Sequence, residues 1–397
     1  MKKIYFTFLV ALAGLSAFAQ GVWIQKANFS GTAREGAAAF TIGTKAYVGT
    51  GNPGGNYLSD LWEWDQSNNT WTQKANFTGG GRRYCFAFTI NGKGYIGTGE
   101  LTGYIKQSDF YQYDPSSNTW TQKAAFPGAA RTHAKGFAIG SKGYAGTGYT
   151  GSSFLSDFYE YDPSNDSWTQ KANFPGGPRA GGMGFSLGTM GYMGMGVNNS
   201  TYYSDFYEYN PSTNTWMQKA SLPGAGRAYL SYFSFLQSGF VGTGYDGNTR
   251  LQDFWEWNQW SNTWSQKANF SGGARNLNVG FAIGNKGYMG IGIDIGGNLV
   301  LDFWEYTSDD AAVHELQSYN TASVYPNPFS SECIISFTSE IKMGTLGIFD
   351  ANGKKVREVR FSGSQVKLMK DDLSAGVYFY QVCDPHMLLS SGKLIVE

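Results

Sequence analysis

Large apolar residues alternate with small or polar residues in short stretches along most of the chain. Ala87-Phe88-Thr89-Ile90 is one such stretch and Leu61-Trp62-Glu63-Trp64 is another. A period of two is typical of β-strands that bury one face. The stretches are separated by pairs such as Asn91-Gly92 and Asp114-Pro115, which favour tight turns. The pattern predicts an all-β chain.

The strand pattern repeats with a period of 48 or 49 residues. A tryptophan opens the last strand of each unit, and these residues are Trp23, Trp71, Trp120, Trp168, Trp216 and Trp264. Eleven residues after each tryptophan stands an arginine: Arg34, Arg82, Arg131, Arg179, Arg227 and Arg275. An aspartate precedes each third strand: Asp60, Asp109, Asp157, Asp205, Asp253 and Asp302. Self-similarity at this period indicates a repeat array or a propeller.

Each repeat has room for four strands, but the sixth repeat lacks its fourth. The residue eleven positions after Asp302 is Val313, where the other repeats have tryptophan. The missing strand is present at the start of the chain, from Trp23 to Phe29. If this segment completes the sixth sheet, the ring closes and leaves no unpaired edge there. We therefore predict a six-bladed β-propeller closed by its N-terminal strand.

A phenylalanine recurs in the first strand of every repeat, and most of its flanking positions are small. These phenylalanines are Phe40, Phe88, Phe137, Phe185, Phe233 and Phe281. The large face of one sheet can nest against the small face of the next. We therefore interpret the repeated aromatic residues as core rather than as a ligand platform.

These repeats resemble the kelch family of β-propellers, whose blades have about this period. The resemblance extends from Trp23 to Tyr306 and departs from the family in the glycines, which are split, as in Gly97-Thr98-Gly99, rather than adjacent. It implies that residues 20–306 form a six-bladed kelch-like propeller.

Two further segments flank the repeats. Lys2 and Lys3, an apolar run and Ala17-Phe18-Ala19 predict a secretory signal peptide over residues 1–19. No later stretch is long and apolar enough to suggest an integral membrane segment. After a linker at 307–323, alternating short strands in residues 324–397 predict a small β-sandwich.

The tail is similar to the C-terminal sorting domain of type IX secretion. The similarity rests on its Pro-rich opening at 325–329, the turn Asn352-Gly353-Lys354, the strand that starts Gly376-Val377-Tyr378 and a final strand with Lys393. It implies contact with the type IX machinery and export through the periplasm and outer membrane, to a secreted or cell-surface location. An ordinary accessory sandwich is the alternative.

Charge and cysteine content exclude some classes of protein. The chain has 30 basic and 30 acidic residues, which argues against a nucleic-acid partner because such binding needs a basic excess. Its 12 Trp, 26 Tyr and 28 Phe exclude a disordered chain. Three cysteines are too few for a disulfide framework. Cys333 and Cys383 could pair if the tail brings them together, but we favour two free thiols.

The candidate binding surface is the face that carries the repeat arginines, the repeat aspartates and the loops of variable length. We favour a structural Arg-Asp clamp in every blade, such as Arg34 with Asp60; the alternative is a ring of guanidiniums that binds a carboxylate or sulfate. Residues that differ between repeats and follow the arginines, near the mouth of the axial channel on this face, are stronger candidates. They are Glu35, Arg83, Tyr84, His133, Tyr229 and Asn276, with Tyr104, Lys106, Asp246 and Arg250 in variable loops. The candidate ligand-binding set is Arg34, Arg82, Arg83, Tyr84, Arg131, His133, Arg179, Arg227, Tyr229, Arg275 and Asn276.

A catalytic constellation is nearly absent. His133 is the one histidine of the propeller, and His314 and His386 lie beyond it. A copper oxidase of the galactose-oxidase type needs several histidines in the ring, so ligand number excludes that chemistry. Asp246-Gly247-Asn248 and Asp294 offer oxygen ligands of the kind that calcium takes, but so short a run is weak evidence and we predict no metal and no cofactor.

The sequence therefore predicts an exported, non-catalytic propeller that binds a glycan or a protein ligand on its arginine-bearing face. One alternative is a carbohydrate-active enzyme of the sugar mutarotase or lyase type. The other is an adhesive or structural surface protein.

Overall fold

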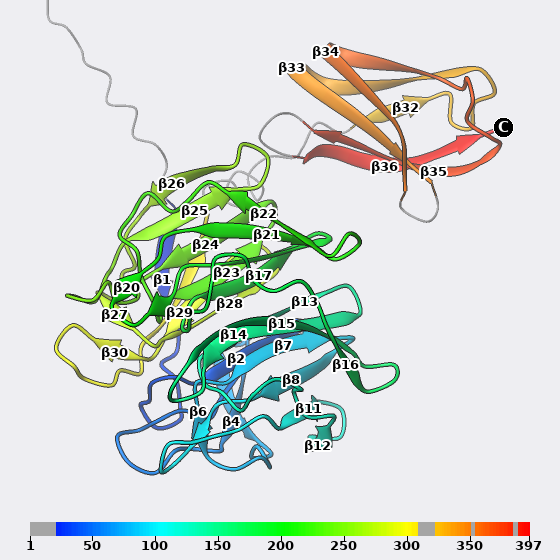
Figure 1. Ribbon diagram of the computed structural model, residues 1–397. Coiled ribbons are helices and arrows are strands. Elements are labelled where there is room, and N and C mark those ends of the chain that lie inside the picture. The colour runs from blue at the N-terminus through cyan, green and yellow to red at the C-terminus, as the bar shows by residue number, and fades with distance from the viewer. Residues whose placement is uncertain (1–20, 309–321, 351–353, 384–387) are drawn as a thin grey trace, which may run out of the picture.

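The computed structural model describes residues 21–308, 322–350, 354–383 and 388–397. Within these ranges the secondary structure consists of strands and turns without any helix, which confirms the all-β prediction. Figure 1 shows a larger part, residues 21–308, and a smaller part made by the tail. The predicted signal peptide at 1–19 and most of the predicted linker, 309–321, lie outside the described residues.

Residues 21–308 contain six antiparallel sheets of four strands each (Figure 1). The first sheet has β2 (Ala38–Ile42), β3 (Lys45–Gly49), β4 (Leu61–Asp65) and β5 (Thr70–Lys74). The second has β7 (Phe86–Ile90), β8 (Lys93–Gly97), β11 (Phe110–Asp114) and β12 (Thr119–Lys123). The third has β13 (Lys135–Ile139), β14 (Lys142–Tyr149), β15 (Phe154–Asp162) and β16 (Ser167–Gln170).

The remaining three sheets follow the same plan. The fourth has β17 (Met183–Leu187), β18 (Met190–Gly194), β21 (Phe206–Asn210) and β22 (Thr215–Lys219). The fifth has β23 (Ser231–Phe235), β24 (Ser238–Gly242), β25 (Phe254–Asn258) and β26 (Thr263–Lys267). The sixth has β28 (Val279–Ile283), β29 (Lys286–Gly290), β31 (Phe303–Thr307) and β1 (Val22–Gln25). Short strands in the loops are β6 (Arg82–Arg83), β9 (Glu100–Leu101), β10 (Ile105–Lys106), β19 (Val197–Asn198), β20 (Thr201–Tyr202), β27 (Arg275–Asn276) and β30 (Ile293–Asp294).

In the first five sheets, the turn between the third and fourth strands links the sheet to the one before it. In the second sheet, the Asp114 carboxylate accepts the Ser116 N–H at 2.9 Å, which is the usual role of Asp in such turns. Asn118 adopts a left-handed φ of 55°, and its Oδ1 accepts the N–H of Ala75, which follows β5, at 2.9 Å. The same turn chemistry therefore makes the hairpin and joins two sheets.

Six aromatic cores lie between consecutive sheets. The core between the first two sheets contains Phe40 and Tyr113, and another core contains Trp64 of the first sheet and Tyr288 of the sixth. The last sheet therefore packs against the first. The expected nesting of large and small faces is present, because a Cβ at Gly94 would come within 2.1 Å of the Phe40 ring. The repeated phenylalanine thus fills space that only glycine leaves open.

The first strand of the chain completes the last sheet, as the missing fourth strand leads us to expect. β1 pairs antiparallel with β31, with Trp23 opposite Tyr306. The Trp23 ring lies 4.9–5.0 Å from the rings of Phe254, Phe270 and Tyr306. Its Nε1 donates to the Ala268 carbonyl at 3.2 Å. Segments at the two ends of residues 21–308 therefore share one sheet and one aromatic core.

The tail differs from the predicted two-sheet sandwich. Its strands are β32 (Ser323–Tyr325), β33 (Glu332–Phe349), β34 (Lys355–Met369), β35 (Gly376–Cys383) and β36 (Leu388–Val396). They form one five-stranded sheet, because β33 continues through both of the short strands that the sequence suggests and pairs with β32 and β35 near its opposite ends. Both halves of β33 contribute to one core, with Ile335 and Ile348. The turn expected at Asn352-Gly353-Lys354 lies largely in residues 351–353, outside the described ranges.

The disulfide considered between Cys333 and Cys383 is not formed. Cys333 is buried in the tail core, and Cys383 is opposite Thr345 on β33.

The packing of β1 predicts that Trp23→Ala lowers the free energy of unfolding by about 3–5 kcal/mol, because a buried indole leaves a cavity between three rings. Ile24→Ala is the matched control, since Ile24 is on the same strand but 49% exposed, and its cost should stay within about 0.5 kcal/mol. Chemical denaturation followed by tryptophan fluorescence and circular dichroism measures both. Equal effects of the two substitutions would contradict the placement of β1.

Candidate functional site

The six repeat arginines form buried pairs with the six repeat aspartates. Each arginine side chain is 0–2% exposed, and each aspartate side chain is 17–22% exposed. Each arginine Nη2 donates to an aspartate Oδ2 at 2.7–2.9 Å. Each Nη1 donates to the other oxygen of that carboxylate and to a backbone carbonyl, as Arg131 does to Thr147 at 2.9 Å. In five repeats the guanidinium also lies over a phenylalanine ring, at 4.7–4.9 Å.

This arrangement favours the structural clamp over a guanidinium ring that binds an anion. Charge-assisted bidentate bonds are the strongest that an arginine makes, and the buried guanidiniums have no exposed surface for a ligand. Burial acts to raise the pKa of Asp253, but hydrogen bonds from Arg227 outweigh it and lower that pKa. The repeat arginines therefore hold the loop before each first strand to the start of the third strand. They are Arg34, Arg82, Arg131, Arg179, Arg227 and Arg275.

The six residues that stand two positions after the repeat arginines, one in each repeat, form a closed cycle of backbone hydrogen bonds. We call this cycle the mouth ring. Its members are Gly36, Tyr84, His133, Gly181, Tyr229 and Leu277. The N–H of each member donates to the carbonyl of the previous one at 2.7–3.1 Å, and Gly36 donates to Leu277 at 3.0 Å. Consecutive repeats are thus joined at the mouth by main-chain atoms.

All six members of the mouth ring have a left-handed backbone, with φ between 56° and 66°. Glycine adopts this conformation freely, but tyrosine, histidine and leucine pay a conformational penalty there. Four of the six positions nevertheless carry large side chains. Strained residues of this kind cluster at ligand-binding and catalytic sites, so the mouth ring is the strongest candidate for a functional site.

Three aromatic side chains of the mouth ring lie together. The ring centroids of Tyr84 and His133 are 3.8 Å apart and stacked, and those of His133 and Tyr229 are 4.9 Å apart. The Tyr84 hydroxyl is hydrogen-bonded to both oxygens of Glu35, at 2.9 and 3.0 Å. Burial raises the pKa of Tyr229 to about 12. Burial, with the nearby charges of Lys135 and other cations, lowers the pKa of His133 well below its ordinary value, so the imidazole is neutral at physiological pH.

A pocket of about 520 Å³ opens on this aromatic group. Its walls are Tyr84, His133, Tyr229, Tyr245, Asn248, Thr249, Arg250, Asn276, Leu277 and Ile295. Arg250 Nε donates to Asn276 Oδ1 at 3.1 Å, so two expected residues meet at the rim. The structure therefore brings together five residues of the sequence hypotheses: Tyr84, His133, Tyr229, Arg250 and Asn276.

Sequence reasoning missed half of the pocket. Leu277 occupies the same position after its arginine as Tyr84 does, and comparison of these positions across the repeats would have identified it. Tyr245 follows the Gly-x-Gly of its repeat, where the other repeats have Asn52, Glu100, Tyr149, Val197 and Ile293. Both positions vary between repeats, whereas the repeat arginine and the Gly-x-Gly glycines that precede them are constant.

Arg83 belongs to a separate charged network beside the pocket. Its guanidinium bonds Glu35 at 2.7 Å and Glu100 at 2.8 Å, and it lies 4.3 Å from the centroid of Tyr84. Lys106 bonds Glu100 at 2.6 Å. Burial acts to raise the pKa of Glu100, but the bonds from Lys106 and Arg83 lower it. The Glu100 carboxylate therefore stays ionised, and the network supports the wall that holds Tyr84.

Asp246 and Asp294, the two calcium candidates, stabilise the turns of their own loops. Asp246 Oδ1 accepts the N–H groups of Asn248 and Thr249 at 2.8 Å, and Asp294 Oδ1 accepts that of Asn298 at 2.8 Å. Among the described residues no group of three or more His, Cys, Asp or Glu is placed to hold a metal ion. These carboxylates thus have a structural use in the loops where calcium was considered.

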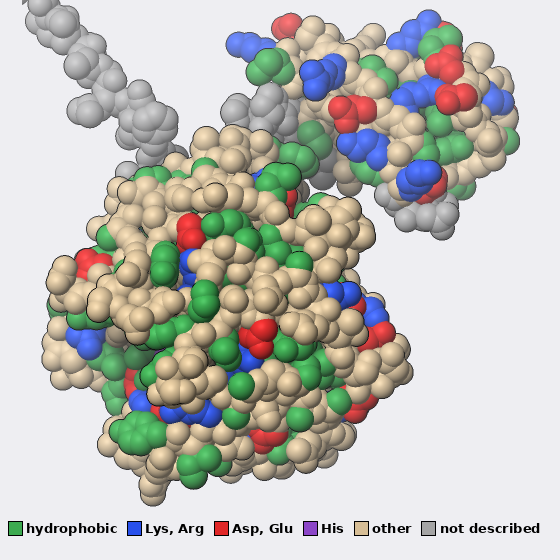
Figure 2. Space-filling model, in the orientation of Figure 1, with side chains coloured by type: hydrophobic (Ala, Val, Ile, Leu, Met, Phe, Trp, Pro, Cys, Tyr) green, Lys and Arg blue, Asp and Glu red, His purple; other side chains and the backbone are tan. Residues whose placement is uncertain are grey.

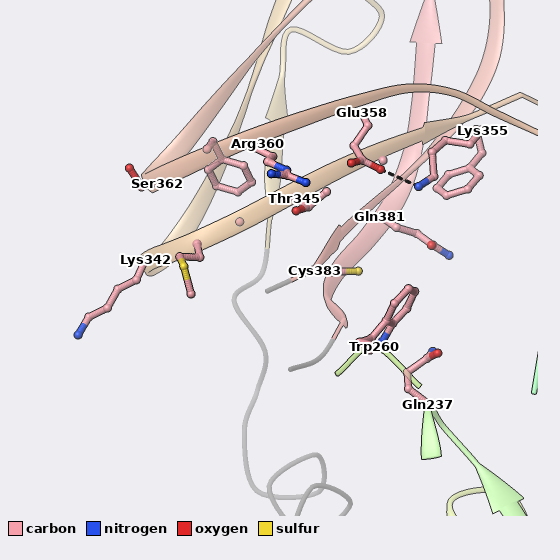
Figure 3. A pocket seen from close by; sticks show the side chains of 15 residues that line it. Gln237, Trp260, Lys342, Thr345, Lys355, Glu358, Arg360, Ser362, Gln381 and Cys383 are labelled. Atoms are coloured by element: carbon pink, nitrogen blue, oxygen red, sulfur yellow. Dashed lines mark hydrogen bonds and ion pairs between the residues drawn. The ribbon is translucent and has the colours of Figure 1, made fainter. Parts of the chain in front are cut away.

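A larger space, of about 1020 Å³, lies between Trp260 on the β25–β26 turn and one face of the tail (Figure 3). Figure 3 shows Lys355 paired with Glu358 on the tail side and Trp260 with Gln237 on the other side. Its walls come from two separately packed cores. It is therefore a gap between two parts of the chain rather than a cleft within either.

Comparison with known proteins identifies the tail. Residues 323–397 match the family model described as the secretion system C-terminal sorting domain. This type IX sorting domain indicates export to the cell surface or out of the cell, and it implies interaction with the type IX machinery. No described helix is long and apolar enough to cross a membrane.

The larger part resembles a solved propeller. The structure of YjhT, a kelch-like propeller-type protein, aligns with a TM-score of 0.62 and 17% identity, and the alignment covers 71% of this chain and 97% of that one. At this identity the likeness concerns the fold alone, and it supports a propeller-like fold. No curated protein matches the chain.

The clamp predicts that Arg131→Met lowers the free energy of unfolding by about 3 kcal/mol, because Asp157 loses both of its guanidinium donors. Asp157 is 20% exposed, which places the cost at the low end for a broken buried pair. Arg250→Met is the control, since Arg250 has no carboxylate partner among the described residues, and it should change stability by about 0.5 kcal/mol or less. Urea denaturation compares the two, and an Arg131 variant as stable as its control would refute the clamp.

His133 should remain neutral at mildly acidic pH. Its lowered pKa predicts that the midpoint of its ring-proton NMR titration lies well below 6.5, the value near which an unperturbed histidine titrates. The resonances are assigned by their loss in His133→Gln. A full titration centred near pH 6.5 would show that the imidazole is more open to water than its stacked position implies.

Proposed function

We propose that the exported protein binds a glycan in the mouth pocket of a closed, six-bladed kelch-type propeller. In this proposal residues 1–19 are the signal peptide, 20–306 the propeller, 307–323 the linker and 324–397 the sorting domain. The ligand-binding residues are those of the pocket, and the clamped repeat arginines are excluded from the set because they are buried.

Three sets of contacts support the closed form. The first strands of successive sheets contact one another in order, and β28 contacts β2. An aromatic core joins the sixth sheet to the first. The mouth ring ends with the hydrogen bond from Gly36 to Leu277. Each of these contacts continues across the junction between the last repeat and the first.

The observation that carries the binding proposal is that the pocket is built from residues that differ between repeats. Tyr84, His133, Tyr229 and Leu277 occupy one repeat position, at which the other two repeats have glycine. Positions that serve the fold are nearly identical in all repeats, as the arginines and aspartates are. Large side chains held in a strained backbone around a concavity are most simply explained by a ligand.

The chemistry of the pocket favours a saccharide. Tyr and His rings offer apolar faces, and Asn248, Thr249, Asn276 and Arg250 offer hydrogen-bond groups beside them. Pockets that combine apolar walls with a few fixed polar groups suit small ligands, whereas protein partners use flatter surfaces. Figure 2 shows charged side chains scattered among polar and hydrophobic ones on the visible face of residues 21–308.

The test is a glycan array followed by calorimetry on the best binder. Tyr229→Ala and Arg250→Ala should each weaken binding at least tenfold, which corresponds to about 1.4 kcal/mol. Trp260→Ala is the control, because Trp260 is an aromatic residue of the same domain that is 63% exposed and outside the pocket. All three variants should keep the wild-type melting temperature within a few degrees.

Three results would overturn the proposal: no binder on the array, binding that survives both pocket substitutions, or equal loss in the Trp260 control. The same sugars should be recovered unchanged after incubation. Conversion of a sugar that depends on Tyr229 or His133 would instead support the carbohydrate-active enzyme.

A further inference from the structure

Two small cavities continue beneath the mouth pocket, between the first strands of the sheets. The upper one, of about 50 Å³, shares Tyr84, His133, Tyr229 and Leu277 with the pocket above. The lower one, of about 80 Å³, is lined by residues 37–39 of the first sheet and by parts of β7, β13, β23 and β28. We call them together the central channel. Each is larger than the roughly 10–15 Å³ that one water needs.

One charged residue, Lys135, lines both cavities. It is the fourth residue after its repeat arginine, and the other repeats have Ala38, Phe86, Met183, Ser231 and Val279 at that position. All five are buried and uncharged. A lysine that replaces a core residue in one repeat of six is not needed to build the sheet.

Lys135 has no ion-pair or hydrogen-bond partner among the described residues. Its Nζ lies 5.4 Å from the ring centroid of Tyr232 on β23. Since β17 lies between β13 and β23 in the order of first strands, the side chain extends across the channel. Burial lowers the pKa of Lys135 to about 8, so most of the population is still protonated at neutral pH.

The other titratable groups of the channel supply no negative charge. Burial raises the pKa of Cys85 to about 12 and also raises those of Tyr84 and Tyr232. His133 is neutral, as described above, and no aspartate or glutamate lines either cavity. Lys135 is half-buried, and an ammonium held against apolar walls carries a cost when no counter-ion is near.

The Asn278 amide is a second hydrogen-bond donor that lines the channel. Asn278 is 9% exposed and lines both cavities. Its Oδ1 accepts the Thr243 hydroxyl at 3.0 Å, whereas its buried Nδ2 has no hydrogen-bond partner among the residues that the structure describes. Buried amide N–H groups are nearly always satisfied in native proteins. The channel thus contains a cation and an unpaired hydrogen-bond donor, and no carboxylate is among the described residues that line it.

We propose that the central channel binds a small inorganic anion of halide size, with Lys135 as its main contact and the Asn278 amide as its second donor. The anion neutralises Lys135, the one charged residue among the described residues that line the channel. It also bridges the third and sixth sheets across the centre of the fold. The two proposed contacts, Lys135 and Asn278, are not among the walls of the saccharide pocket, so the proposal does not depend on what binds there.

Bromide is the probe, because it substitutes for chloride and scatters anomalously. In crystals of the full chain soaked in sodium bromide, an anomalous peak should lie in contact with Lys135 Nζ inside the channel. In Lys135→Met that peak should vanish while surface peaks remain. Lys93→Met is the matched control, since Lys93 pairs with Asp114 on the second sheet, and it should keep the channel peak.

Thermal unfolding gives an independent measurement in solution. At constant ionic strength, replacing gluconate by bromide should raise the melting temperature of the wild type and of Lys93→Met, because a ligand that binds only the folded state stabilises it. Lys135→Met should show no such rise. It should also be at least as stable as the wild type in gluconate, because an apolar side chain replaces an uncompensated charge.

Two outcomes would overturn the proposal. One is a crystal with bromide only at the surface, or with a channel peak that persists in Lys135→Met. The other is a bromide-dependent rise in melting temperature that is equal in Lys135→Met and the wild type.

Discussion

The pairing of β1 with β31 is the contact on which the rest of the larger domain depends. It joins residues nearly 300 positions apart, since Val22 is opposite Thr307. Without it the sixth sheet has three strands, Trp23 is missing from the core that includes Tyr306, and a sheet edge is open to other chains. Because loop closure on this scale is entropically costly and slow, we expect the ring to be completed late in folding.

Repeated and non-repeated residues have separate roles. The arginines, aspartates, phenylalanines and tryptophans recur because every sheet needs the same clamp, the same nesting of rings and glycines and the same bond to its predecessor. Once these contacts fix the backbone, the mouth ring offers six equivalent positions whose side chains are free to differ. Glycine at two of them leaves room, and Tyr, His, Tyr and Leu at the others build a wall.

The pocket and the central channel share that wall but differ in chemistry. Above it, Asn276 and Arg250 surround an opening with uncharged donors, acceptors and one cation. Below it, Lys135 is the only charged residue among the described residues that line the cavities. Tyr84, His133, Tyr229 and Leu277 border both the pocket and the channel.

The sequence by itself determined the strand pattern, the repeat and the identity of the clamp, because these depend on local alternation and on fixed spacing. It also located the sorting tail, although it divided β33 into two strands, since local turn signals do not show where a strand continues through them. Tertiary structure decided which variable residues meet. Tyr245 and Ile295 reach the pocket from loops about 50 residues apart in the chain, and Lys135 reads as an ordinary strand residue until its neighbours are known. Burial and the absence of a counter-charge are properties of the surroundings, so only the packed fold could reveal them.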